Sequence, residues 1–354
     1  MSFRTRRVIF MTPFYMLFEF FLLKFLFMLF YPLDDMTLLA ITILIGILNI
    51  APMLAEEKKT RFITRFLTEI SAIWMWASLM FLIDIVIIYL IGNLNQGIVF
   101  IMLLAVPAIG IYGYYKAHNL VINEREMKLD NLEKEINIVH ISDVHFGAVR
   151  YRKIISQLKN ALNELSDTCD VAIISGDLAD GSCLVQEDDF LPLGDVEMPI
   201  IFTPGNHDFY PGIDNVIRAC NNAGIIVLDN ESMEINGLNI YGLTFSFDKI
   251  QMPSPDKLKS EIKEDKTNII IYHVPYSWDT HSKLGFDVQL SGHTHGGQFY
   301  PVKWIADLMF NYNMGLFSDD LGHYIHVTTG VGSMDQPIRW GTDSEVVVLK
   351  LRKN

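Results

Sequence analysis

Cysteine and charge are both scarce in this sequence. Its 354 residues include three cysteines, at positions 169, 183 and 220, an odd and widely spaced set that excludes a disulfide framework. Reduced thiols favour the cytoplasm. Only 19% of the residues are charged, whereas 50% are hydrophobic, and the mean hydropathy is +0.26. The chain is therefore too apolar for an ordinary soluble enzyme, and a membrane-embedded part is expected.

Basic residues are few in the second part of the chain. Residues 119–354 contain 19 Lys and Arg against 34 Asp and Glu. This balance leaves no basic stripe that would follow a nucleic-acid backbone. We expect no nucleic-acid partner.

The excess of apolar residues lies before residue 118. Four segments there approach the roughly 20 residues that a bilayer core requires: Val8 to Tyr31, Met36 to Ala55, Ile70 to Ile91 and Gly97 to Tyr115. The sequence therefore predicts a transmembrane helical region over 1–118, with about four helices, followed by a second domain over 119–354. The first span also contains Pro13, Glu19 and Lys24, and its failure to cross would invert the topology.

Positive charge predicts the orientation of the helices. Arginines precede the first span, and Lys58, Lys59, Arg61 and Arg65 lie between the second and third, while the other two connections have no Lys or Arg. Because such charge marks the cytoplasmic side, we expect a multi-pass membrane protein with a cytoplasmic second domain. The alternative is twin-arginine export from the TRRVIF sequence at 5–10, but no small-residue cleavage site follows it.

Five short apolar runs in the second domain each end in a polar motif. The motifs are DVH (143–145), GDLAD (176–180), GNHD (205–208), HVP (273–275) and GHTHG (292–296). The runs are typical of buried strands, and ligands at the carboxyl ends of neighbouring strands converge on one crevice. The motifs supply seven candidate metal ligands: Asp143, His145, Asp177, Asn206, His273, His293 and His295.

These ligand types indicate a hydrolytic metal site. Carboxylates, an amide and imidazoles without a nearby cysteine suit Mn, Fe or Zn and do not suit a closed structural zinc site. Seven ligands are too many for one ion. Shared between two divalent ions, they predict a centre that clamps a phosphoryl group and lowers the pKa of a bound water to roughly 7. The expected reaction is phosphoester hydrolysis.

The five motifs together resemble the calcineurin-like metallophosphoesterase superfamily, whose pattern is DxH, GDxxD, GNH(D/E), an isolated His and GHxH. The resemblance covers roughly residues 127–354, and GVGSMDQPIRWG (330–341) is similar to the closing segment of the membrane-anchored bacterial and archaeal branch. It implies an α/β fold, a two-sheet sandwich flanked by helices, and attack by metal-bound hydroxide on a phosphoester or pyrophosphate bond. It also implies two ligand sets joined by one bridging carboxylate: Asp143, His145 and His295 for the first ion, Asn206, His273 and His293 for the second, with Asp177 between them.

The resemblance also places residues beside the substrate. His207 faces the substrate next to Asn206, and its imidazole is a candidate acid for the leaving alkoxide. The alternative is a turn histidine that only positions phosphate. Asp208 either orients His207 or receives loop amides. Arg339 either meets a phosphoryl oxygen or is a buried salt-bridge residue.

Local patterns predict further elements of the second domain. Apolar residues repeat at helical spacing from Arg152 to Leu165, and a second helix is expected from Ile213 to Ala223. An Asn-Gly turn at 236–237 within Ser232 to Phe247 predicts a hairpin. Alternating strands and helices favour a layered α/β domain.

The segment Phe299 to Phe317 is apolar and aromatic, although it follows metal-type ligands directly. Its ordinary interpretation is a loop packed on the core. On a tethered enzyme it is also a candidate for contact with the bilayer or with acyl chains, which favours a lipid-linked substrate. The alternatives are a phosphodiesterase for a soluble, nucleotide-type substrate and a non-catalytic metal-binding membrane scaffold.

Overall fold

The computed structural model describes residues 3–56, 60–248 and 252–354. It begins with four long helices, α1 (Phe3–Met28), α2 (Asp35–Glu56), α3 (Phe62–Ile91) and α4 (Gln96–His118). Each is long and apolar enough to cross a membrane. They correspond to the four predicted segments, except that α3 begins at Phe62 and not near Ile70. Lys58 and Lys59, which entered the charge argument, lie outside the described residues.

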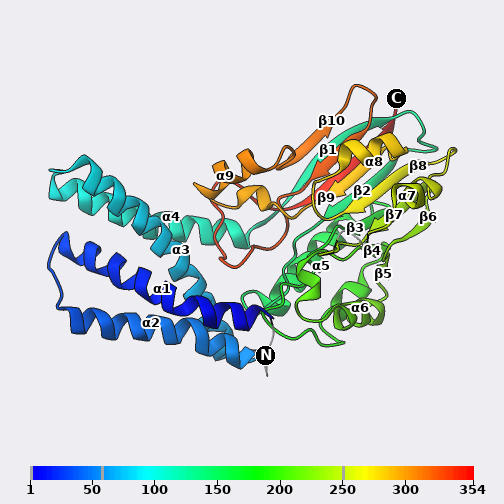
Figure 1. Cartoon of the computed structure of the whole chain (residues 1–354). Coiled ribbons are helices and arrows are strands. Elements are labelled where there is room, and N and C mark those ends of the chain that lie inside the picture. Colours follow the sequence, from blue (N-terminus) through cyan, green and yellow to red (C-terminus); the bar gives the residue numbers. More distant parts are fainter. Residues whose placement is uncertain (1–2, 57–59, 249–251) are drawn as a thin grey trace.

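Neighbouring helices run in opposite directions (Figure 1). One end of the helical region lies against the rest of the molecule, and the other end points away from it. Glu19 does not pair with Lys24. Its carboxylate accepts hydrogen bonds from Ser78 Oγ at 2.7 Å and Trp74 Nε1 at 3.3 Å, while Lys24 Nζ lies 2.8 Å from Asp35 Oδ1. The two charges of α1 therefore have separate partners, one inside the helical region and one near the α1–α2 connection.

Two six-stranded sheets follow, as the two-sheet prediction requires. The first has the strand order β1-β12-β2-β3-β4-β5 and the second has the order β10-β11-β9-β8-β7-β6. The first sheet consists of β1 (Leu120–Leu129), β2 (Ile136–Ile141), β3 (Val171–Ile174), β4 (Ile200–Phe202), β5 (Ile226–Val227) and β12 (Ser344–Lys353). The second consists of β6 (Glu231–Ile235), β7 (Leu238–Leu243), β8 (Thr267–Tyr272), β9 (Val288–Ser291), β10 (Gly315–Ser318) and β11 (Tyr324–Val327).

Shorter helices cover the sandwich: α5 (Tyr151–Leu165), α6 (Ile213–Asn222), α7 (Pro255–Ser260), α8 (Trp278–Leu284) and α9 (Val302–Met309). The two predicted helices correspond to α5 and α6. The predicted hairpin is β6–β7, which pairs in antiparallel register around Asn236 and Gly237, both at positive φ. Local sequence pattern was sufficient for these elements.

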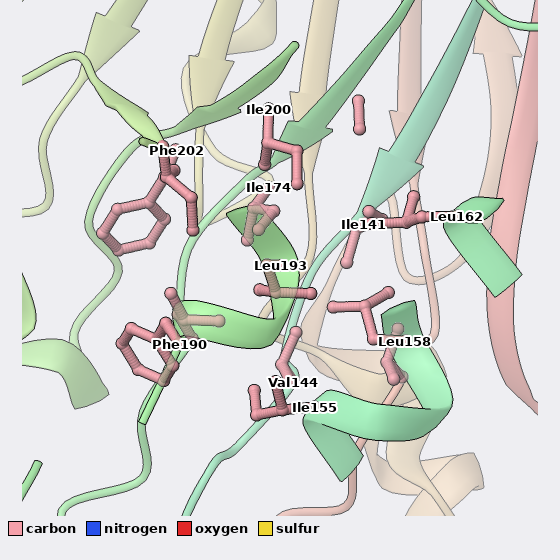
Figure 2. Packing of buried hydrophobic residues seen from close by; sticks show 14 of the residues in the cluster. Ile141, Val144, Ile155, Leu158, Leu162, Ile174, Phe190, Leu193, Ile200 and Phe202 are labelled. Atoms are coloured by element: carbon pink, nitrogen blue, oxygen red, sulfur yellow. The ribbon is translucent and has the colours of Figure 1, made fainter. Parts of the chain in front are cut away.

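Separate apolar cores hold the layers together. One cluster lies between the two sheets and joins residues such as Ile138 and Val171 to Ile269 and Leu290. A second lies outside the first sheet, where Leu158 and Leu162 of α5 pack near Ile141 (Figure 2). Because α5 has a single apolar face, it buries that face on the sheet and leaves its polar face to solvent. The strand ends that bear the five motifs are thus held by packing on both sides.

Candidate metal centre

Each of the five motifs follows a strand that is parallel to at least one neighbour in its sheet, although β2 is antiparallel to β12 on its other side. In the first sheet β2, β3 and β4 run parallel, and in the second β8 and β9 do so. Their carboxyl ends meet at one edge of the sandwich, and two sheets contribute, not one. The structure brings the seven candidate ligands together there: Asp143, His145, Asp177, Asn206, His273, His293 and His295.

Three of these side chains form a first group. His145 Nε2 lies 3.0 Å from His295 Nε2, and Asp143 Oδ1 lies 3.6 Å from the former and 3.2 Å from the latter. All three residues are buried. One carboxylate oxygen and two imidazole nitrogens facing a common point are a donor set that suits a divalent transition metal.

A second group lies beside the first. Asp177 Oδ2 is 3.0 Å from His273 Nε2, and His293 Nδ1 is 3.0 Å from Asn206 Oδ1. The rings of His273 and His293 are 5.2 Å apart at their centroids. These four residues present a carboxylate oxygen, an amide oxygen and two imidazole nitrogens.

Asp177 lies between the two groups. Its Oδ2 is 3.0 Å from His273 Nε2 and 3.9 Å from His145 Nε2, whereas its Oδ1 accepts a hydrogen bond from the His207 amide at 2.8 Å. The resemblance implies that Asp177 is the bridging carboxylate. With Oδ1 taken by an amide, Oδ2 is the atom that faces both groups.

Asp143 is held in the same way. Its Oδ2 accepts the His293 amide at 2.9 Å, and among the described residues its buried Oδ1 has no hydrogen-bond partner. His273 Nε2 is likewise buried without one. Since buried polar atoms are nearly always satisfied, these atoms fit a site built for a cation. The residues present therefore fit the predicted metals.

The backbone is strained where it presents the candidate ligands. Five of the seven lie at positive φ, which non-glycine residues rarely adopt: Asp143, His145, Asp177, His293 and His295. Two motif glycines allow close approach. A Cβ on Gly205 would lie 2.3 Å from Asp177 Oδ1, and one on Gly292 would lie 2.2 Å from Asp143 Oδ2. Such concentrated strain is typical of functional sites.

The carboxylates and burial act on the histidines in opposite directions. Burial lowers the pKa of both His293 and His295 to about 4. At His273 burial also disfavours the charged form, but the nearby Asp177 and Asp143 outweigh it and raise the pKa to about 9. Without a cation, His273 is thus the imidazole that balances the buried carboxylates.

His273 is oriented by a backbone group that residue type does not reveal. Its Nδ1 lies 2.7 Å from the carbonyl oxygen of Ser175, and the Ser175 hydroxyl lies 2.8 Å from His140 Nε2. His140 in turn pairs with His326 at 2.7 Å. This buried chain supports a candidate ligand histidine from behind.

His207 lies at the margin of the site. Its ring centroid is 4.9 Å from that of His145, and its Nδ1 lies 3.4 Å from the carbonyl oxygen of Asp180. Burial lowers its pKa. Asp208 does not orient it, because both Asp208 oxygens receive loop amides: Oδ2 accepts those of Asp177 and Gly205, and Oδ1 accepts that of Ala179. This geometry agrees with the alternative in which Asp208 receives loop amides.

Arg339 is buried behind the first group. Its guanidinium donates to the carbonyl oxygens of Thr329, Gly332 and Asp343, and Nη2 lies 3.4 Å from His295 Nδ1. The side chain has no exposed surface. A contact with phosphate would require these bonds to break, so the geometry favours the buried alternative, with carbonyl oxygens as partners in place of a salt bridge.

Comparison with known proteins agrees with this geometry. Residues 136–297 match the calcineurin-like phosphoesterase family. An uncharacterized metallophosphoesterase of Helicobacter pylori is 29% identical over 65% of this chain and 63% of its own length. One from Aquifex aeolicus is 29% identical over 69% of this chain and 96% of its own length. A transmembrane protein with metallophosphoesterase domain from Danio rerio is 25% identical over 74% of this chain and 64% of its own length.

The chain thus spans less than two thirds of the length of the Helicobacter and Danio proteins. The family match over residues 136–297 includes all five motifs. Sequence, fold and the clustered donors lead to the same assignment. Residues 136–297 of this chain form a calcineurin-like phosphoesterase domain, and the chain is similar to proteins named metallophosphoesterases, including a transmembrane one.

Proposed function

We propose that this protein is a membrane-anchored phosphoesterase that works with two divalent metal ions, with Mn, Fe and Zn as the candidates. The observation that supports this is the pair of donor groups that face each other across Asp177 Oδ2. When bound, such ions would polarise a phosphoryl group and supply an activated water at neutral pH.

The residues of this chain then have separate tasks. Asp143, His145 and His295 would hold the first ion, and Asn206, His273 and His293 would hold the second. Asp177, whose Oδ2 faces both groups, would be shared between the two ions. Asn206 also borders the substrate, and His207, at the margin, donates a proton to the leaving oxygen.

Removal and return of metal tests the activity. The full chain, purified and treated with a chelator, should lose hydrolysis of 4-nitrophenyl phosphate and of bis(4-nitrophenyl) phosphate. Mn, Fe or Zn should restore at least one of the two, with close to two ions bound per chain by elemental analysis. Bound metal without turnover of either compound would contradict the proposal and favour the non-catalytic scaffold.

The four N-terminal helices are proposed to anchor the domain with its active site on the cytoplasmic side. The start of α1, the end of α2, the start of α3 and the end of α4 all lie at the end of the helical region nearest the sheets (Figure 1). Arg4, Arg6 and Arg7 lie in the first turns of α1, Lys58, Lys59 and Arg61 lie between α2 and α3, and Arg65 lies in the first turn of α3. Because positive charge favours the cytoplasmic face, the domain is placed on that face.

A lipid-linked phosphoester is the proposed substrate class, and helix α9 supports it. The segment Phe299 to Phe317 is not only a packed loop, because it contains α9, which exposes an apolar surface. The exposed fraction is 89% for Leu308, 66% for Met309 and 62% for Trp304. Phe310 differs from these, since its ring stacks on Tyr276 at 5.7 Å and lies 6.1 Å from His293. The exposed residues are therefore available to a bilayer, while Phe310 belongs to the edge of the site.

A triple substitution tests the role of α9. Trp304, Leu308 and Met309 replaced by Ser should weaken hydrolysis of a long-chain phosphatidyl substrate in vesicles and leave 4-nitrophenyl phosphate unaffected. Equal loss with both compounds would mean that α9 belongs to the folded core. No change with either, together with activity on nucleotide phosphodiesters, would favour the soluble-substrate alternative.

A further inference from the structure

A mostly apolar cavity of about 580 Å³ lies between the N-terminal helices and the loops of the phosphoesterase domain. Its helical wall includes Phe14 and Phe18 of α1, Met53 of α2 and Ala72 of α3. The volume is within the range of about 300–1,000 Å³ that is usual for sites that bind small ligands. Its position is distinct from that of α9, which none of the lining residues belong to.

The opposite wall belongs to the loops that follow β2 and β3. It includes Val149, Asp180 and Ser182, the last two within and just after the GDLAD motif, together with Asp335. The helical side carries nearly all the apolar lining, among which Thr12, Tyr15, Asn49, Thr68 and Ser71 are interspersed, whereas the domain side is polar apart from Val149. A ligand that fits both ends is an amphiphile.

The polar end adjoins the metal centre. The carbonyl oxygen of Asp180 lies 3.4 Å from His207 Nδ1, and the His207 ring is 4.9 Å from that of His145. His207 therefore separates the cavity from the first group of donors. A molecule with its phosphoryl group at the donors and its chain in the cavity would pass beside His207 and Asp180.

We propose that this cavity binds the hydrocarbon chain of the substrate, so that the enzyme acts on an amphiphile whose phosphoryl group sits at the metal centre. The inference rests on the proposed function and assigns it a specific subsite. Residues of three of the four membrane-capable helices line the cavity, so it borders the part of the chain that is proposed to lie in the bilayer. A soluble nucleotide would leave this wall facing water, which the hydrophobic effect opposes.

Chain-length dependence tests the subsite. The probes are n-alkylphosphonates from ethyl to octyl, measured as inhibitors of 4-nitrophenyl phosphate hydrolysis by the full chain in vesicles. Each methylene buried in the cavity should lower the inhibition constant by up to about four-fold, the equivalent of about 0.8 kcal/mol. Partition into the vesicles is common to all variants and cancels in their comparison.

Filling the cavity should remove this dependence. Ala72→Phe places a ring in the cavity and should reduce the dependence per methylene to that of partition alone, while ethylphosphonate binds as before. Ala105→Phe is the matched control, because Ala105 is an exposed position of α4 outside the cavity, and it should behave as wild type. Thr68→Phe, which also lines the cavity, serves if Ala72→Phe does not accumulate.

The outcomes separate the two proposals. If the inhibition constant depends on chain length in both cavity variants as it does in wild type, the subsite is wrong. If both variants lose 4-nitrophenyl phosphate hydrolysis and phosphonate binding equally, the cavity is a structural lipid site and the subsite is also wrong. If wild type hydrolyses no phosphoester at all, the proposed function fails. Calorimetric binding of octylphosphonate against ethylphosphonate still measures the cavity in that case, and equal affinities would overturn the subsite.

Discussion

Asp208 is expected to be essential for the shape of the metal centre, although it faces no substrate. Its buried carboxylate accepts three backbone amides, those of Asp177 and Gly205 on Oδ2 and that of Ala179 on Oδ1, each at 2.8 or 2.9 Å. These bonds join the GDLAD loop after β3 to the GNHD loop after β4. The substitution Asp208→Asn keeps the size of the side chain but replaces one acceptor oxygen with an NH₂ group.

The structure gives the magnitude. If the asparagine oxygen replaces Oδ2, the bonds from the Asp177 and Gly205 amides are retained. The asparagine NH₂ group then faces the Ala179 amide, and because both groups are donors, this hydrogen bond is lost. A hydrogen bond to a charged group contributes about 1.5–3 kcal/mol to stability, and leaving a buried amide without a partner costs a similar amount. The two values describe the same broken contact in part, so they are not simply added. We expect Asp208→Asn to lower the free energy of unfolding by about 2–4 kcal/mol.

The three cysteines provide the assay, because Cys169, Cys183 and Cys220 are free and buried. Their labelling by a thiol reagent, followed against urea concentration, reports unfolding of the phosphoesterase domain. Asp195→Asn is the matched control, since Asp195 makes only an exposed ion pair with Lys159 and should change stability by less than about 1 kcal/mol. If both variants unfold at the same urea concentration and bind metal equally, the reasoning is wrong.

Three further results are expected. Asp177→Asn should abolish turnover and reduce bound metal, measured by elemental analysis, because the oxygen that faces both groups loses its charge; normal activity with two ions bound would refute the bridge. His207→Ala should slow alkyl phosphate hydrolysis by about 10²–10⁴-fold with metal content unchanged and slow aryl phosphates much less, whereas equal losses would assign His207 to phosphate positioning. In right-side-out vesicles a cysteine introduced at Asn93 should react with an impermeant thiol reagent and one at Leu321, 80% exposed, should not, while the reverse pattern would reject the cytoplasmic orientation. Native Cys183 cannot serve there, because it is buried.

Much of this molecule was predictable because its signals are local. A strand needs only a short apolar run, and each motif follows its run directly, so the sequence was sufficient to indicate β2, β3, β4, β8 and β9 and the edge at which they end. The helices α1 to α4 were equally predictable from the sequence, since length and apolarity decide whether a segment can cross a bilayer.

Other features depend on contacts between distant segments and could not be predicted. The sequence does not show that Asp177 Oδ1 is taken by the His207 amide, or that the Ser175 carbonyl orients His273, because backbone groups are present at every residue. The exposure of α9 was also hidden: Leu308 and Phe310 are both apolar, yet one is at the surface and the other packs beside His293. Residue type gives the chemistry of a site, and tertiary packing decides which atom is available.

The helical region and the phosphoesterase domain share contacts that reach the metal centre. The carbonyl oxygen of Gly113 in α4 accepts the Arg339 amide at 2.9 Å, and the Arg339 guanidinium lies 3.4 Å from His295 Nδ1. At the end of the same helix the carbonyl oxygen of Ala117 accepts bonds from Arg150 at 2.7 Å and Ser344 at 2.9 Å. A boundary at residue 118 thus separates two compositions but not two independent sets of interactions. Since the candidate ligand His295 is contacted by Arg339, whose backbone amide is bonded to α4, the membrane-capable helices help to position the candidate metal centre.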